Sequence, residues 1–131
     1  MEYFCSYFLT TYLIVFLDPS PPKIAKSSGS SDLTQTLKAD VTIGQNVVVL
    51  YGADLFIQCP VKAEPKETIM WVGPPDVNIK DEGIVQLNGG SALKISKVGK
   101  SAVGSYKCIA SNVFGTDFAI TKVAVAGKPT I

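Results

Sequence analysis

The sequence predicts an all-β fold, a Greek-key sandwich of two facing sheets, and three features carry that prediction. Two cysteines, Cys59 and Cys108, bracket the single tryptophan, Trp71. Tyr106 stands two residues before the second cysteine. Around these positions, short runs rich in β-branched and aromatic residues are separated by Gly, Pro and Asn, which is typical of many short strands joined by turns.

The first half of the domain divides into an edge strand and two core strands. Residues 41–43 and 47–50 are predicted to form a split first strand, and residues 55–61 carry an inward-facing apolar residue at every second position. A strand over 67–72 points Ile69 and Trp71 inward. Gly73, Pro74 and Pro75 end it, because proline cannot donate a backbone hydrogen bond.

The second half is predicted as three strands that follow a short one. Residues 84–87 form the short strand, and residues 91–96 place Leu93 inside. The strand over 105–111 carries Tyr106 and Cys108 inward and leads to a hairpin over 112–115. Gly115 is expected there at a positive φ, and the last strand runs to residue 125.

The runs LKI at 93–95 and GSYKCIASN at 104–112, with Val98 between them, resemble the intermediate (I-set) immunoglobulin domain over about residues 40–125. Within that superfamily, the segments CPV at 59–61 and GSALKI at 90–95 are most similar to modules of ADAMTS-like proteins, papilin and hemicentin, which are matrix glycoproteins. The resemblance implies that Trp71 and Leu93 pack in the core and that Tyr106 forms a tyrosine corner. It also implies a disulfide between Cys59 and Cys108 across the two sheets. The alternative is a pair of buried free thiols in another all-β domain.

Composition also divides the chain into segments. Residues 1–17 are nearly all apolar and fit a secretion signal or an uncleaved anchor, or else an alternative start joined to a domain of a longer chain. Residues 18–39 are rich in Pro and Ser and are interpreted as a flexible linker. Residues 40–126 form the predicted domain, and residues 127–131 are interpreted as a departing linker.

The residue content argues against an enzyme and against nucleic-acid binding. The 12 cationic residues are all lysine and nearly balance 11 acidic ones, and the chain has no histidine. No nucleophile and base are paired in the sequence, and Asp76, Asp81 and Glu82 are the only carboxylate cluster. We therefore expect no catalytic residues, no metal and no cofactor. A glycosaminoglycan patch would need Lys94, Lys97, Lys100 and Lys107, which the predicted strands scatter over two sheets.

Strand alternation predicts an apolar outer face. If residues 123 and 125 face the core, then the last strand turns Phe118 and Ile120 outward. The same argument places three more apolar residues on that outer face, so the predicted partner-binding residues are Met70, Val72, Ile109, Phe118 and Ile120. A one-residue shift of register, or cover by the N-terminal tail, is the alternative.

These observations predict an extracellular or cell-surface interaction and adhesion module whose partner is a protein: a neighbouring domain, another copy or a different chain. The alternative is a spacer repeat of an intracellular giant muscle protein. Contact with a membrane is expected only if residues 3–17 remain as an anchor. No N-x-S/T glycosylation site occurs in the chain.

Overall fold

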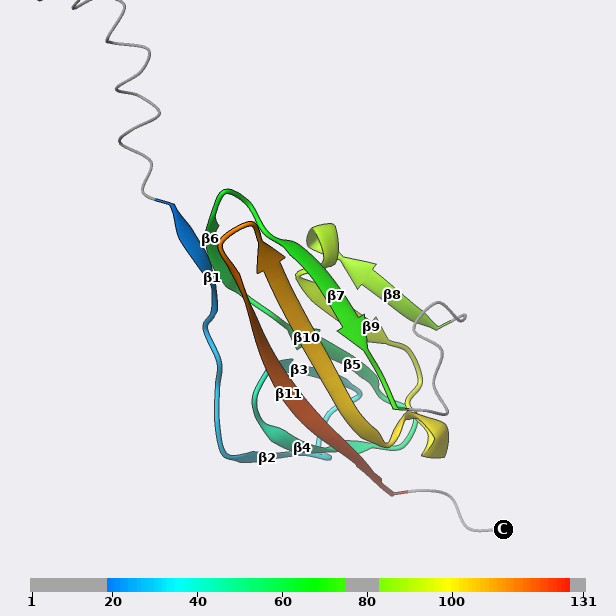
Figure 1. Cartoon of the computed structure of the whole chain (residues 1–131). Helices are drawn as coiled ribbons and strands as arrows, with labels where there is room; N and C mark the ends of the chain where they lie inside the picture. The colour runs from blue at the N-terminus through cyan, green and yellow to red at the C-terminus, as the bar shows by residue number, and fades with distance from the viewer. Residues whose placement is uncertain (1–18, 75–82, 128–131) are drawn as a thin grey trace, which may run out of the picture.

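The computed structural model describes residues 19–74 and 83–127, and their strands form two main sheets that face one another (Figure 1). The larger sheet has the order β2-β4-β11-β10-β7. Its strands are β2 (Ser30–Leu33), β4 (Asn46–Leu50), β7 (Thr68–Val72), β10 (Gly104–Asn112) and β11 (Gly115–Ala126). The smaller sheet has the order β3-β5-β9-β8. Its strands are β3 (Lys38–Thr42), β5 (Asp54–Gln58), β8 (Ile84–Leu87) and β9 (Ala92–Ile95).

Two more strands and two short helices complete the secondary structure of the described residues. The strands β1 (Ser20–Ile24) and β6 (Val61–Glu64) pair with each other antiparallel at one end of the sandwich. The 3-10 helices are η1 (Asn88–Gly90), which joins β8 to β9, and η2 (Lys100–Ala102). The all-β sandwich is therefore confirmed.

The core lies between the two sheets and is built from the residues that strand alternation turns inward. Leu55, Ile57 and Leu93 from the smaller sheet are fully buried, as is Tyr106 from the larger sheet. Cys59 and Cys108 form the predicted disulfide, with 49 residues of sequence separation. Closing a loop of that length removes about 4 kcal/mol of chain entropy from the unfolded state in the simple model.

The polar atoms of two buried aromatic side chains have their hydrogen bonds satisfied in this core. The hydroxyl of Tyr106 donates to the carbonyl oxygen of Ala102 at 2.7 Å, which confirms the tyrosine corner. The indole Nε1 of Trp71 donates to the carbonyl oxygen of Gly90 at 2.7 Å. Burial raises the pKa of Tyr106 to about 12, so its hydroxyl stays a neutral donor at any physiological pH.

The segment that we interpreted as a linker over residues 18–39 differs from the expectation. It contains β1 and β2 and the first residues of β3, and its Ile24 is only 4 % exposed within the core. The prediction relied on composition, which the Ser-rich run 27–31 dominates. Pro22 and Ile24 are both buried and alternate with exposed Pro21 and Lys23. The segment therefore has the two-residue periodicity of a strand, although its composition is typical of a linker.

The split first strand is present but is arranged unexpectedly. β4 pairs parallel with β11, and β3 pairs parallel with β5 in the opposite sheet. The chain reverses between them at Gly44, whose φ of +116° suits glycine. The two halves of the predicted strand therefore belong to different sheets, with β3 at the edge of one and β4 between β2 and β11 in the other.

The predicted role of Gly115 is also corrected. Asn112 pairs with Gly115 across a two-residue hairpin, but Gly115 is not among the residues with positive φ. A Cβ at this position would lie 3.0 Å from the Cβ of Pro21. The absence of a side chain there allows β1 to approach the hairpin closely.

Some sequence-based predictions concern residues outside the described ranges. These are the apolar segment 1–17, the carboxylates Asp76, Asp81 and Glu82, and most of the C-terminal segment, from residue 128 to 131.

Candidate functional site

The outer face of β7, β10 and β11 carries the five apolar side chains that the sequence analysis singled out. Ile109 on β10 pairs with Met70 on β7 and with Phe118 on β11. Lys107, two residues before Ile109, pairs with Val72 and Ile120 in the same way. Because partners across adjacent strands share one face, these residues form one continuous patch. We call it the outer apolar face, made of Met70, Val72, Ile109, Phe118 and Ile120.

The exposure of these side chains agrees with the predicted register. Met70 is 61 % exposed and Phe118 is 49 % exposed, and Val72 and Ile120 are also exposed. Ile109, at the centre, is half-buried between its neighbours. On β11 the intervening Ala119, Thr121 and Val123 are buried, so the last strand has the predicted register.

Two lysines lie within and beside this face. The Nζ of Lys107 lies 4.4 Å from the centroid of the Phe118 ring, a cation–π distance. Lys122 is exposed on β11, two residues after Ile120, and therefore points to the same side. The outer apolar face therefore has an apolar centre with positive charge at one end.

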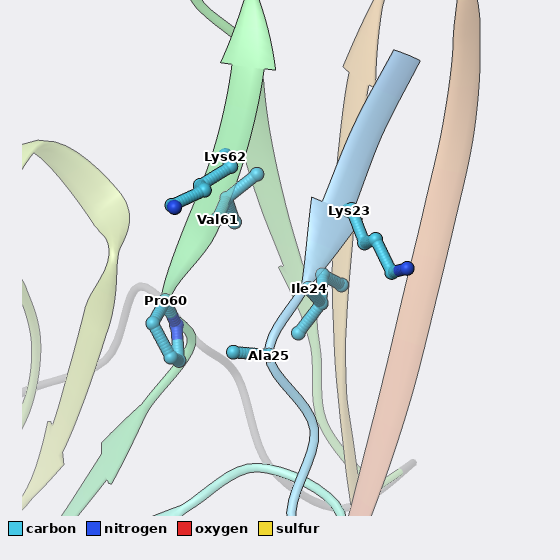
Figure 2. A pocket seen from close by; sticks show the side chains of 6 residues that line it. All are labelled: Lys23, Ile24, Ala25, Pro60, Val61 and Lys62. Carbon is cyan, nitrogen blue, oxygen red and sulfur yellow. The ribbon is translucent and has the colours of Figure 1, made fainter. Parts of the chain in front are cut away.

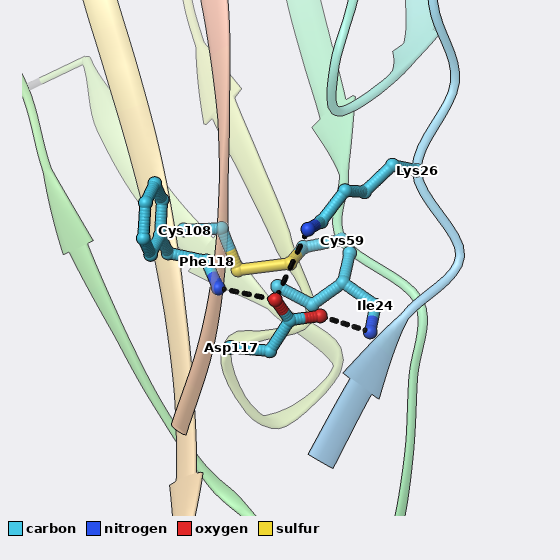
Figure 3. A network of polar contacts seen from close by, with 6 residues as sticks. All are labelled: Ile24, Lys26, Cys59, Cys108, Asp117 and Phe118. Atoms are coloured by element: carbon cyan, nitrogen blue, oxygen red, sulfur yellow. Dashed lines mark hydrogen bonds and ion pairs between the residues drawn. A yellow bond between two sulfur atoms is a disulfide. The ribbon is translucent and has the colours of Figure 1, made fainter.

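Asp117 anchors the N-terminal strand against β11 and is a residue that sequence reasoning missed (Figure 3). Its carboxylate accepts hydrogen bonds from the backbone N–H of Ile24 at 2.9 Å and from Lys26 Nζ at 3.0 Å. The backbone N–H of Phe118 also donates to it, at 2.9 Å. Desolvation by itself raises the pKa of Asp117, but these donors and the charge of Lys26 outweigh it, so the net pKa is lowered.

A pocket of about 460 Å³ lies where β1 meets β6 (Figure 2). Ile24 and Ala25 line it from the β1 side, and Pro60 and Val61 line it from the β6 side. Lys23 and Lys62 are direct cross-strand partners, and Figure 2 shows their ammonium groups directed away from each other. The pocket lining contains no carboxylate, histidine or hydroxyl, and its ionisable groups are the amines of Lys23 and Lys62.

Other kinds of site were also sought among residues 19–74 and 83–127. No group of three or more His, Cys, Asp or Glu side chains there could hold a metal ion. No helix in those two ranges is long and apolar enough to cross a membrane. Lys94 on β9 and Lys107 on β10 lie on different sheets, so the structure does not gather the four candidate lysines into one patch.

The two sheets, the inter-sheet disulfide, the packed tryptophan and the tyrosine corner together define an immunoglobulin-like β-sandwich. The sequence model described as "Immunoglobulin I-set domain" matches residues 38–125. The chain belongs to the immunoglobulin I-set domain family.

Curated relatives are much longer proteins that contain a similar segment. Contactin-4 of Homo sapiens is 39% identical over 85 residues, which are 65% of this chain and 8% of that protein. Matrix-remodeling-associated protein 5 of Homo sapiens is 32% identical over 92 residues, 66% of this chain and 3% of that protein. Vascular endothelial growth factor receptor 2 of Mus musculus is 31% identical over 83 residues, 63% of this chain and 6% of that protein. The chain thus spans less than a tenth of the length of each of these relatives.

Solved structures show the same fold. Neural ectodermal development factor IMP-L2 is 32% identical, with a TM-score of 0.55, over 60% of this chain and 38% of that one. A chimeric titin Z1Z2 superimposes with a TM-score of 0.63 at 19% identity, over 83% of this chain and 97% of that chain.

Proposed function

We propose that this chain is a non-enzymatic, extracellular protein-interaction module and that the outer apolar face is its binding surface. The observation that carries the proposal is the gathering of five apolar side chains on the solvent side of one sheet. The outer side of such a sheet normally carries polar residues, because only the inner side packs against the partner sheet. The proposed surface therefore departs from what folding alone requires.

The energetics favour a surface that is covered in use. Burying a Leu- or Phe-sized side chain contributes roughly 1.5 to 3 kcal/mol relative to leaving it exposed. Phe118 and Met70 lie on either side of Ile109, so a partner that covers the centre of the face contacts both. Aromatic side chains dominate binding energy at protein interfaces, and we assign Phe118 as the anchor.

The charge beside the face defines the partner chemistry. Lys107 and Lys122 lie at the end of the face that contains Ile120. A partner with an apolar patch and one or two carboxylates at its rim matches this arrangement, and such complementary rim charges raise association rates and fix register. A domain of another protein or a neighbouring domain of the same chain provides a surface of this kind.

Three observations support a location outside the cell. The Cys59–Cys108 disulfide is the form expected in an oxidising compartment. The apolar segment 3–17 is suited to a secretion signal or an anchor. The names of two relatives refer to matrix remodelling and to a growth factor receptor. A matrix or cell-surface parent protein, of the kind that the resemblance to papilin and hemicentin implies, is consistent with these names.

A spacer repeat of an intracellular muscle protein is the second candidate, and the likeness to titin domains favours it at the level of fold alone. The redox state of the cysteine pair separates the two candidates. Non-reducing peptide mass spectrometry of protein taken from its native cells should show Cys59 joined to Cys108 for an extracellular module. Two free thiols in that material favour the intracellular spacer.

The binding surface is tested by a charge-bearing double variant, Phe118→Asp with Ile120→Lys. Binding should be measured by surface plasmon resonance against a panel of purified extracellular domains. The matched control, Val85→Asp with Val103→Lys, makes the same charge change at valines that are 48% and 44% exposed outside the face. We expect the first variant to fold and lose binding, and the control to keep it. Equal binding by both variants contradicts the proposed surface.

A further inference from the structure

The turn between β8 and β9 contains the chain's only asparagine–glycine pair, Asn88 and Gly89. The Cγ of an asparagine can be attacked by the backbone nitrogen of the next residue, and a side chain on that next residue hinders the attack. The other three asparagines precede branched residues, which are Val47, Ile79 and Val113. Because glycine has no side chain, Asn88 is the asparagine at which this reaction is least hindered.

The folded turn keeps this pair accessible to water. Asn88 and Gly89 are both exposed in η1, and both lie in the left-handed region, with φ of 53° and 69°. A Cβ added to Gly89 would meet no described atom within 4 Å beyond its chain neighbours. The N–H and the hydroxyl of Ser91 donate to the carbonyl oxygen of Asn88, at 3.4 Å and 3.0 Å. Both bonds restrain the backbone of Asn88, and neither restrains its side-chain amide.

We propose that Asn88 is a site of spontaneous deamidation and isomerisation, with water as the co-reactant. The backbone nitrogen of Gly89 loses its proton to hydroxide and forms a bond to Cγ of Asn88. The Cγ–Nδ2 bond breaks, and Nδ2 leaves as ammonia after it takes a proton from water. Water then opens the succinimide ring, at Cγ to give aspartate or at the backbone carbonyl carbon to give isoaspartate. The site shares no residue with the outer apolar face, so the inference goes beyond the proposed function.

Isoaspartate in this turn alters both its charge and its length. It adds a negative charge where the amide was neutral, and it adds one methylene to the main chain between Leu87 and Gly89. The next residue, Gly90, is buried, and its carbonyl oxygen accepts the indole N–H of Trp71 at 2.7 Å. A longer main chain displaces this carbonyl, and a buried N–H without an acceptor is destabilising. Modification of an exposed turn therefore reaches Trp71, which pairs with Cys108 of the disulfide.

Asn112 is the internal control, because its side-chain amide is held in place. Its Nδ2 donates to the carbonyl oxygens of Ser20 at 2.8 Å and Pro65 at 3.0 Å. Its Oδ1 accepts the N–H of Phe114 at 2.8 Å. Loss of Nδ2 from Asn112 would break the first two of these hydrogen bonds, and rotation of the amide toward the next backbone nitrogen would break all three. The structure therefore predicts that Asn112 stays intact while Asn88 reacts.

Timed incubation of the full chain in mildly alkaline buffer, followed by peptide mass spectrometry, tests the proposal. The peptide that contains Asn88 should gain the mass difference between a carboxylic acid and an amide, and should separate into an aspartate form and an isoaspartate form. Peptides that contain Asn46 and Asn112 should not change over the same time. The rate should increase with pH, because the attacking group is the deprotonated backbone nitrogen. Asn88→Gln should lose the modification and Gly89→Ala should slow it, since each variant alters one reacting partner.

Fluorescence of the purified isoaspartate form tests the consequence, since Trp71 is the single tryptophan. Its emission should shift to longer wavelength, whereas Asn88→Asp adds the charge without the methylene and should keep the wild-type emission. The urea-unfolded chain, incubated in the same buffer, is the positive control for the reaction. If Asn88 stays intact in the folded chain after the unfolded chain has reacted, or if Asn112 reacts as fast as Asn88, then the proposed site is wrong. An isoaspartate form with unchanged emission overturns the connection to Trp71.

Discussion

Replacing Ile24 with alanine tests whether the N-terminal strand is part of the folded domain or a flexible linker. Ile24 is 4 % exposed and belongs to the core cluster, and its N–H donates to Asp117. Truncating a buried Ile to Ala costs 2–5 kcal/mol, from lost burial and from the cavity that remains. A linker residue at the same position would cost almost nothing.

The expected magnitude lies toward the lower end of that range. Only Ser20, Lys23 and Ile24 of β1 have partners on β6, and the register is irregular between the first two. A weakened β1 can therefore detach locally, and the loss cannot exceed the free energy that holds it in place. We expect Ile24→Ala to reduce the free energy of unfolding by about 2–3 kcal/mol.

Urea denaturation of the oxidised full chain, followed by tryptophan fluorescence, measures this loss. Lys23→Ala is the matched control, since Lys23 is exposed on the same strand and should change stability by less than about 0.5 kcal/mol. If Ile24→Ala is as neutral as the control, then β1 is not packed on the domain and the reasoning fails.

Three further predictions concern the polar and covalent elements of the fold. Tyr106→Phe leaves the buried carbonyl of Ala102 without its donor and should destabilise the domain by about 1–3 kcal/mol in the same urea assay; no measurable change contradicts the tyrosine corner. Asp117 has a lowered pKa in the folded state, so its stabilising effect is complete above its ordinary value of 3.8 and is lost as the pH falls through the lower folded value. Asp117→Asn should therefore be less stable than the wild type at neutral pH, and thermal unfolding should show the difference narrowing in acid; a difference independent of pH contradicts this. Reducing the Cys59–Cys108 disulfide should lower the free energy of unfolding by about 4 kcal/mol, measured by urea denaturation with midpoint and slope fitted separately for each form, and an unchanged free energy of unfolding contradicts it.

The sequence was sufficient to predict the elements whose residues alternate regularly. Tyr106 and Cys108 on β10 and Leu93 on β9 are buried as expected, because each of these strands alternates between inward and outward side chains. The outward direction of Phe118 and Ile120 followed from the same period on β11. The placement of the outer apolar face could therefore be predicted before the structure was known.

The N-terminal elements could not be predicted from composition. β1 contains Pro21 and Pro22, and β2 is dominated by serine, so neither has the content of a typical strand. What holds β1 in place is tertiary: Ile24 enters the core, and Asp117, 93 residues later, accepts its N–H. The sequence alone predicts that a single aspartate in the last strand faces solvent. Only the folded structure shows that Asp117 accepts the N–H of Ile24.

The identity of the strands at the sheet edges was also beyond the sequence analysis. It depends on β2 and β3 covering β4 and β5, which requires the parallel pairings and the reversal at Gly44. Local patterns identify strands but carry no information about which strands become neighbours.

Hydroxyl-radical footprinting of the chain in its native assembly tests the central claim most directly, since it requires no knowledge of the partner. Met70 and Phe118 should be oxidised readily in the isolated protein and protected in the assembly. Leu37 and Tyr51, which are exposed away from the outer apolar face, should be oxidised equally in both. If Met70 and Phe118 remain as reactive in the assembly as in the isolated protein, then this face is not the surface by which the protein acts.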